Sequence, residues 1–198
     1  MMKNVIIFGE PRSGKSTLAN MIVDKFNYQV IHVDAIRDTF KTIYPELNIA
    51  PDIAINNKKF QLFIQEYLNR NTIKEERNKY GYVVEGCETS VEDCNRLFNT
   101  DENIIYYLAP ADITPEEFFN NIRINDTEND WTFKLTDEEL MQKVKSLITK
   151  GKTLKKECEK YNINFVDTSH NRKEKLDTIL TNIELEIKND YKRIHKSK

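Results

Sequence analysis

The sequence lacks several features that mark broad classes of protein. Its three cysteines, Cys87, Cys94 and Cys158, are odd in number and form no C-x-x-C pair, so we expect free thiols in a reducing compartment. No apolar run approaches the ~20 residues of a membrane-spanning helix, and no signal peptide is recognised. The net charge is −2 and the pI about 6.0, which gives no general attraction to nucleic acid. These absences predict a soluble, cytoplasmic protein without a membrane or nucleic-acid partner.

The chain also lacks internal repeats and Gly/Ser-rich linkers. Its length of 198 residues therefore fits a single α/β domain, residues 1–198, with a sizeable buried core. Neither an Asn-Lys-x-Asp guanine motif nor an Asp-x-x-Gly switch is present, which argues against a GTPase switch.

A phosphate-binding pattern lies near the beginning of the chain. Residues 9–16 match G-x-x-x-x-G-K-[ST], the Walker A pattern of P-loop proteins, without a gap. The apolar residues 5–8 precede the match, and residues 14–26 follow it with apolar side chains at helical spacing. This strand–loop–helix context makes the match specific, because the pattern requires a strand before it and a helix after it.

The residue types of this loop suit a nucleoside triphosphate. Glycine lets the backbone turn and come close, so that successive N–H groups surround a phosphate at the start of a helix. The charge of Lys15 contributes about 4 kcal/mol at an intermediate dielectric, and the hydroxyl of Ser16 is a ligand for Mg²⁺. The alternative, a glycine-rich turn capped by Ser16 or Thr17, gives Lys15 no role. We assign nucleotide binding to Gly9, Pro11, Arg12, Ser13, Gly14, Lys15, Ser16 and Thr17.

Short apolar runs alternate with helical patterns along the chain. This alternation predicts a doubly wound parallel sheet with right-handed crossovers. Ligands of such sheets bind beyond the carboxyl ends of the strands, so the residues that follow each strand are the candidate site. The expected strands are 5–8, 30–33, 82–84, 104–108 and 163–166, and the expected helices are 14–26, 59–79, 91–98, 114–124, 136–160 and 171–188.

Acidic residues follow the second and third expected strands. Asp34 is placed where a carboxylate accepts the proton of an attacking hydroxyl or orients it, and Arg37, one helical turn later, suits an anionic group. The alternative is a helix N-cap at Asp34 and a surface arginine. Glu85 occupies a position suited to Mg²⁺, and Gly86 lets a substrate approach the backbone. The alternative for Glu85 is a carboxylate that caps the next helix.

A polar segment and a short turn complete the candidate site. Residues 120–136 form an excursion between two helices that suits a mobile lid, in which Arg123 would reach the γ-phosphate. Acids at 126, 128 and 130 have the spacing of a calcium loop, but Trp131 stands where that loop requires glycine. The alternative is a solvated linker. Thr168, after the last strand, lies either against an adenine ring or in a loop that caps the last helix.

On these residues the chain resembles the small P-loop kinases, a group that includes shikimate and gluconate kinases, chloramphenicol phosphotransferase and adenylate kinase. The resemblance covers at least residues 4–182 and rests mainly on the phosphate loop. It implies a five-stranded parallel sheet of order 2-3-1-4-5 with a lid insertion, and an acceptor-binding segment at about residues 35–80. It also implies ATP and Mg²⁺ at Lys15 and Ser16, a catalytic Asp34, a lid arginine at Arg123 and an adenine contact at Thr168.

The departures from this group bear on the acceptor. Adenylate kinase-like enzymes have Asp-Gly-Phe-Pro-Arg after strand three, whereas residues 85–89 here contain no arginine, and Glu88 would repel an anion. The lid also has one arginine where nucleotide kinases have several. Both features argue against a nucleoside monophosphate as the acceptor. Arg12 occupies a position often held by glycine, where it either clamps phosphate or alters the turn.

The sequence therefore predicts an ATP- and Mg²⁺-dependent kinase that phosphorylates a hydroxyl of a small molecule. Two alternatives stay open: a nucleoside or nucleotide kinase, and a nucleotide-binding regulator without catalytic activity.

Overall fold

A computed structural model describes residues 3–47, 49, 58–72 and 81–196, with the side chains up to residue 190. In these residues, parallel strands form one five-stranded sheet of order β2-β3-β1-β4-β5, which confirms the predicted fold. The central strand β1 is buried along its whole length and pairs with β3 on one side and β4 on the other. The strands are β1 (Asn4–Gly9), β2 (Gln29–His32), β3 (Tyr82–Gly86), β4 (Asn103–Ala109) and β5 (Asn164–Asp167).

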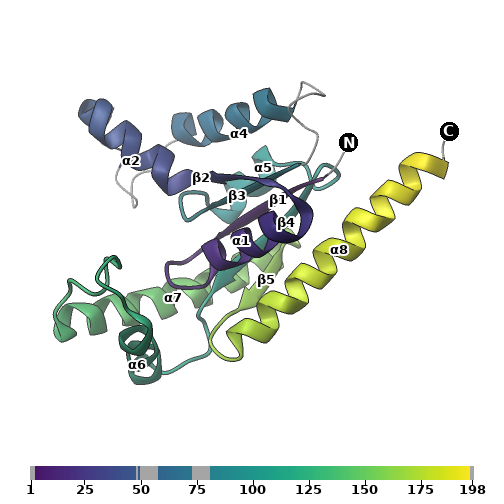
Figure 1. Ribbon diagram of the computed structural model, residues 1–198. Coiled ribbons are helices and arrows are strands. Elements are labelled where there is room, and N and C mark those ends of the chain that lie inside the picture. Colours follow the sequence, from purple (N-terminus) through teal and green to yellow (C-terminus); the bar gives the residue numbers. More distant parts are fainter. Residues whose placement is uncertain (1–2, 48, 50–57, 73–80, 197–198) are drawn as a thin grey trace.

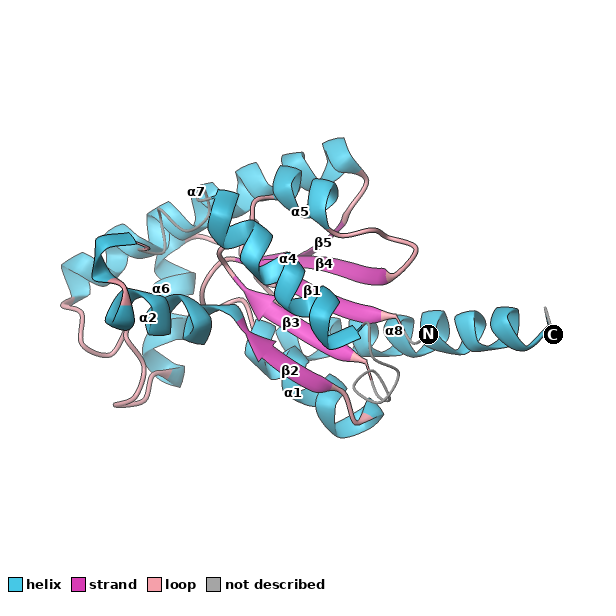
Figure 2. Ribbon diagram, turned by 90° about the horizontal axis from the view of Figure 1, so that it is seen from above, coloured by secondary structure: helices cyan, strands magenta, loops and turns pink. Residues whose placement is uncertain are grey.

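Helices cover both faces of the sheet (Figures 1 and 2). Alternate side chains of β1 explain this arrangement, because Ile6 and Phe8 point to one face while Val5 and Ile7 point to the other. The first pair packs against α2, α4, α5 and α7, and the second pair packs against α1 and α8. The helices are α1 (Lys15–Phe26), α2 (Val33–Ile43), α4 (Lys58–Thr72), α5 (Val91–Leu97), α6 (Pro115–Asn125), α7 (Asp137–Tyr161) and α8 (Arg172–Lys196), with a short 3-10 helix at Pro45–Leu47.

Two of the helix starts follow directly from the sequence. The hydroxyl of Thr114 accepts from the backbone N–H of Glu117, whose carboxylate accepts from the N–H of Thr114, and Pro115 occupies the first helical position of α6. Thr136 and Glu139 form the same reciprocal pair at the start of α7. A third, small core between these helices contains apolar residues of both.

Other boundaries differ from the expectation. The second strand ends at His32, and Val33 begins helix α2, which the sequence analysis did not include among its helices. Residues 120–125 belong to α6, so the irregular segment between α6 and α7 is 126–136; we call it the lid loop. Helix α8 continues to Lys196 rather than ending near residue 188. Helix α4 is described to Thr72, and the remainder of the expected helix 59–79 lies outside the described residues.

Two further features concern the cysteines and the lengths of the helices. Cys87, Cys94 and Cys158 carry free thiols. Within the described part of the chain, every helix is too short or too polar to cross a membrane.

Candidate active site

The phosphate loop takes its shape from two glycines in the left-handed region. Gly9 ends β1 with a φ of 134°, and Gly14 precedes α1 with a φ of 92°. A Cβ atom built on Gly9 would lie 1.9 Å from the carbonyl oxygen of Leu108 in β4, so a side chain has no room there. Arg12 also has a positive φ, 64°, which is uncommon for a residue with a side chain. The loop between β1 and α1 thus has the curved backbone that the sequence pattern requires.

The polar groups of the loop converge near the start of α1. The Nζ atom of Lys15 donates to the carbonyl oxygen of Glu10 at 2.8 Å, which folds the amine back over the loop. The hydroxyl of Ser13 is buried and has no hydrogen-bond partner among the described residues. Burial raises the pKa of Glu10, although Lys150 and Lys15 act in the opposite direction. A buried hydroxyl without a partner, in the same loop as the ammonium group of Lys15, is a suitable place for an oxygen-rich anion.

The carboxylate of Glu85 is the centre of a second group of side chains. Its Oε2 lies 3.3 Å from the hydroxyl of Ser16, and its Oε1 lies 2.6 Å from Nδ1 of His32. The potential ligand atoms of His32, Asp34 and Glu85 all lie within 4.8 Å of one another. The structure therefore brings together Ser16, Asp34 and Glu85, three of the predicted site residues, from three different segments of the chain.

These donors fit the Mg²⁺ that the fold family implies. The hydroxyl of Ser16 and the carboxylate of Glu85 are oxygen ligands at adjacent positions, and Mg²⁺ prefers oxygen ligands. His32 is the one nitrogen donor, and its imidazole suits transition metals better than Mg²⁺. Because Nδ1 of His32 contacts Oε1 of Glu85, the imidazole orients that carboxylate.

His32 is a site residue that the sequence analysis missed. It is the last residue of β2, at the same carboxyl edge of the sheet as the end of β3. The rule that directed attention to Asp34 applies equally to His32, and the register pairs His32 with Glu85 directly. The signal that was available is the position of a polar residue at the end of an expected strand.

Asp34 lies in the first turn of α2 rather than at its N-cap, which is His32. Its Oδ1 accepts the N–H of Ala35 at 2.8 Å, and its side chain is exposed. Its other oxygen forms no hydrogen bond with a described residue, and a ligand oxygen of this carboxylate lies within 4.8 Å of one of Glu85.

Arg37 is held by acidic side chains. Its Nη1 contacts the fully buried carboxylate of Glu88, and its Nε donates to Asp38 at 2.9 Å. The charge of Arg37 is thus already compensated by two carboxylates. A Cβ atom built on Gly86 would lie 2.5 Å from Oε2 of Glu88 and 2.8 Å from Cβ of Val33. The space beside Gly86 is therefore filled by protein atoms.

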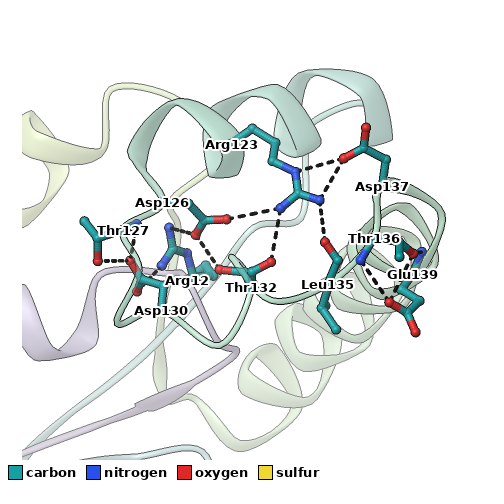
Figure 3. A network of polar contacts seen from close by, with 10 residues as sticks. All are labelled: Arg12, Arg123, Asp126, Thr127, Asp130, Thr132, Leu135, Thr136, Asp137 and Glu139. Atoms are coloured by element: carbon teal, nitrogen blue, oxygen red, sulfur yellow. Dashed lines mark hydrogen bonds and ion pairs between the residues drawn. The ribbon is translucent and has the colours of Figure 1, made fainter.

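Arg123 is also bound within the protein, in the network drawn in Figure 3. Its Nη2 donates to Asp137 and to the carbonyl oxygen of Leu135, both at 2.8 Å, and its Nη1 donates to the carbonyl oxygen of Thr132 at 3.1 Å. These contacts tie the C-terminal turn of α6 to the lid loop and to the first residue of α7. Arg123 therefore organises the lid loop in this structure.

The turn that contains Thr168 follows β5 and is hydrogen-bonded to the end of the neighbouring strand β4. The N–H of Thr168 donates to the carbonyl oxygen of Ala109 at 3.0 Å. The carboxylate of Asp167 accepts from the backbone N–H groups of Ala111 at 3.2 Å and Ser169 at 2.9 Å. These contacts fix the turn at the carboxyl edge of the sheet. The phosphate loop lies at the same edge, where it follows β1 and contacts β4.

Comparison with known proteins adds the fold family. No protein-family model matches the chain, and no curated protein matches it. Among solved structures, a shikimate kinase from Bacteroides thetaiotaomicron is 13% identical with a TM-score of 0.54, covering 95% of this chain and 99% of its own. A gluconokinase from Sinorhizobium meliloti 1021 is 14% identical with a TM-score of 0.57, covering 96% and 97%. The YorR protein from Bacillus subtilis, in complex with phosphorylated GDP, is 12% identical with a TM-score of 0.50, covering 93% and 97%.

At these identities the likeness establishes the fold. The chain has the fold of the small-molecule P-loop kinases, over nearly its whole length.

Proposed function

We propose that the protein is an ATP- and Mg²⁺-dependent kinase that transfers the γ-phosphoryl group to a hydroxyl of a small molecule. One observation supports this proposal above the others. The phosphate loop places Ser16 against Glu85, and Glu85 in turn lies within reach of Asp34. A triphosphate site and a free carboxylate at one sheet edge are the two parts that phosphoryl transfer to an alcohol needs.

Each side chain has a distinct role in this proposal. The loop N–H groups and Lys15 hold the phosphates, and Ser16 with Glu85 holds Mg²⁺, which when bound neutralises phosphate charge. Asp34 orients the acceptor hydroxyl and takes its proton. Arg123 reaches the γ-phosphate only after it gives up contacts such as that with Asp137. Thr168 and its neighbours would contact the adenine ring.

The acceptor side favours a hydroxyl compound over a nucleotide. Arg37, the predicted anion-binding residue, is already compensated by Glu88 and Asp38, so it offers little charge to a phosphate on the acceptor. Two structural neighbours are named for small hydroxylated acceptors, as a shikimate kinase and a gluconokinase. We infer a small polyhydroxylated acceptor, bound by the segment of residues 35–80.

A nucleotide kinase is the second candidate, and one comparison favours it. The YorR protein of similar fold was crystallised with phosphorylated GDP. Incubation with γ-labelled ATP and separate panels of sugars, hydroxy acids, nucleosides and nucleoside monophosphates distinguishes the candidates. We expect label in the sugar or hydroxy-acid panel. Label only in the monophosphate panel would support the second candidate, and ATP binding without transfer to any panel would indicate a regulator.

A variant of Asp34 tests the mechanism once an acceptor is found. We expect Asp34→Asn to lower kcat by about 10²-fold or more and to change the Kd of ATP little, because the carboxylate acts on the acceptor. Asp24→Asn is the matched control, since Asp24 is exposed on α1, away from the strand ends. An equal loss of kcat and of ATP affinity in Asp34→Asn would remove its catalytic role.

A further inference from the structure

Arg12 joins the phosphate loop to the lid loop through two carboxylates. Its Nη1 lies 2.6 Å from Oδ1 of Asp130, and its Nη2 lies 3.0 Å from Oδ1 of Asp126 (Figure 3). Asp130 comes 118 residues after Arg12 in the chain. Arg12 makes this contact while its backbone is in the left-handed region, with a φ of 64°. Such a conformation persists only where the surrounding structure stabilises it. The contact is therefore a specific connection between the two loops.

The place of Arg12 makes this connection sensitive to phosphate. Arg12 lies inside the loop, three residues before Lys15, where a triphosphate would bring several negative oxygens. A guanidinium binds phosphate oxygens in the same bidentate way in which it binds carboxylates. Bound phosphates would therefore compete with Asp126 and Asp130 for Arg12, and they would repel both acids.

We propose that Arg12 is a positioning residue that exchanges partners when nucleotide binds. In the arrangement that the structure describes, it holds the lid loop through Asp126 and Asp130. When phosphates enter the loop, Arg12 turns to them and releases the lid loop, which is then free to close over the acceptor. This inference rests on the proposed function, since it requires a nucleotide in the phosphate loop.

The lid acids are placed so that neither loses all its partners in the exchange. The side chain of Asp126 is 2% exposed, and its Oδ2 lies 3.6 Å from Nη1 of Arg123. Asp130 accepts the N–H and the hydroxyl of Thr127, both at 2.9 Å. The buried charge of Asp126 thus stays near a second arginine, so the departure of Arg12 leaves no isolated buried charge.

The alternative is a permanent tie, in which Arg12 never contacts phosphate. Arg12→Ala and Asp130→Asn break the same ion pair, but only Arg12→Ala also removes a phosphate ligand. If Arg12 exchanges, Arg12→Ala weakens nucleotide binding, whereas Asp130→Asn strengthens it because a competitor is gone. If Arg12 is a permanent tie, the charge of Asp130 still repels phosphate, so Asp130→Asn strengthens binding equally with or without Arg12, whereas competition makes that gain disappear in the double variant Arg12→Ala/Asp130→Asn.

Calorimetry with Mg²⁺ and a non-hydrolysable ATP analogue measures this difference. We expect the Kd to rise on the order of tenfold for Arg12→Ala and to fall about threefold for Asp130→Asn. Arg12→Lys keeps the charge without the planar fork and should give an intermediate Kd. Glu128→Gln is the matched control, since Glu128 is exposed on the same lid loop and forms no ion pair with another described residue. Its Kd should equal that of the wild type.

The only tryptophan of the chain, Trp131, reports the state of the lid loop directly. It follows Asp130 and is 45% exposed. We expect acrylamide quenching of its fluorescence to increase when the analogue is added to the wild type. Quenching should already be increased without nucleotide in Arg12→Ala and Asp130→Asn, and unchanged in Glu128→Gln.

Two results would overturn the exchange while leaving the proposed function intact. One is a fall of Kd on Asp130→Asn that is as large in the Arg12→Ala background as in the wild type. The other is Trp131 quenching in the wild type that does not respond to the analogue although calorimetry registers its binding. If the wild type gave no binding heat at all, the proposed function would fail and the exchange with it, whatever the quenching of the nucleotide-free variants.

Discussion

The phosphate loop and the lid loop meet at Arg12, but they are built from different kinds of contact. The phosphate loop depends on its backbone: Gly9 and Gly14 have positive φ, and Gly9 lies against the backbone of β4. The lid loop depends on side chains, through the ion pairs and hydrogen bonds of Arg12 and Arg123. A loop shaped by its backbone keeps its form when charges change, whereas a loop held by ion pairs responds to ligands, acid and salt.

The largest effect is expected from the ammonium group of the phosphate loop. We predict that Lys15→Met lowers kcat/KM on the order of 10³-fold or more, because the proposed mechanism assigns the neutralisation of charge on the transferred phosphoryl group to this ammonium group. Lys25→Met, at the other end of the same helix, is the control, since Lys25 pairs with Glu184 on the surface. Normal turnover by Lys15→Met would contradict the proposed function.

The next largest effect is a difference in the free energy of unfolding between variants of the two loop glycines. Gly9→Ala should lower the free energy of unfolding by about 2 kcal/mol or more, because its new Cβ would overlap the carbonyl of Leu108. Gly14→Ala should cost less: its φ of 92° also strains a side chain, but the nearest atoms, in Arg172 and Leu176, lie 3.3 Å away rather than 1.9 Å. Urea denaturation of both variants measures the difference. Equal losses would mean that the shape of the loop does not depend on its contact with β4.

A smaller effect is expected in the lid loop. Arg123→Ala removes the contacts with Thr132, Leu135 and Asp137, so the quenching of Trp131 by acrylamide should increase. If Arg123 also reaches the γ-phosphate, kcat should fall about tenfold or more with little change in the Kd of ATP. The control Arg96→Ala breaks an exposed pair with Asp93 far from the lid loop and should change neither quantity.

The smallest effect is a response of the lid loop to acid. Hydrogen bonds from the N–H and hydroxyl of Thr127, and then the charge of Arg12, hold the pKa of Asp130 below its usual value of 3.8. The ionised form is therefore favoured in the folded loop. Its stabilisation is present above the usual pKa and is lost as the pH falls through the lower pKa of the folded state.

Trp131 quenching, measured between pH 7 and 3, should thus stay constant until about pH 4 and rise below it. Asp130→Asn should show high quenching throughout and a flatter profile. A wild-type profile that coincides with that of Asp130→Asn would mean that Asp130 does not hold the lid loop.

Much of the fold could be predicted from the sequence, because its signals are local. The glycine positions of the phosphate loop and the caps at Thr114 and Thr136 each depend on a few neighbouring residues, and the strand order was implied by the family resemblance that the phosphate loop carries. The end of β2 could not be located, because Val33 continues an apolar run although it begins α2. The first turn of that helix contains Asp34, for which the sequence offered a cap and a catalytic role as alternatives.

The site could be predicted only in part, because several of its side chains are defined by distant partners. His32 contacts Glu85, 53 residues away, and Arg37 contacts Glu88, 51 residues away. The sequence analysis treated Arg37 as a residue that binds an anion and Glu88 as a residue that repels one. In the structure the two side chains form an ion pair with each other. Arg12 had two alternative roles in the sequence, and neither included the lid acids that hold it.

The central place of β1 has a consequence for how this protein could acquire new substrates. On one side of β1, strands β3 and β2 end at Gly86 and His32, whereas on the other side β4 and β5 lead to the lid loop and to Thr168. If the proposed function holds, substitutions that alter the recognition of the acceptor would gather on the first side, and the residues proposed to bind the phosphate donor would stay as they are.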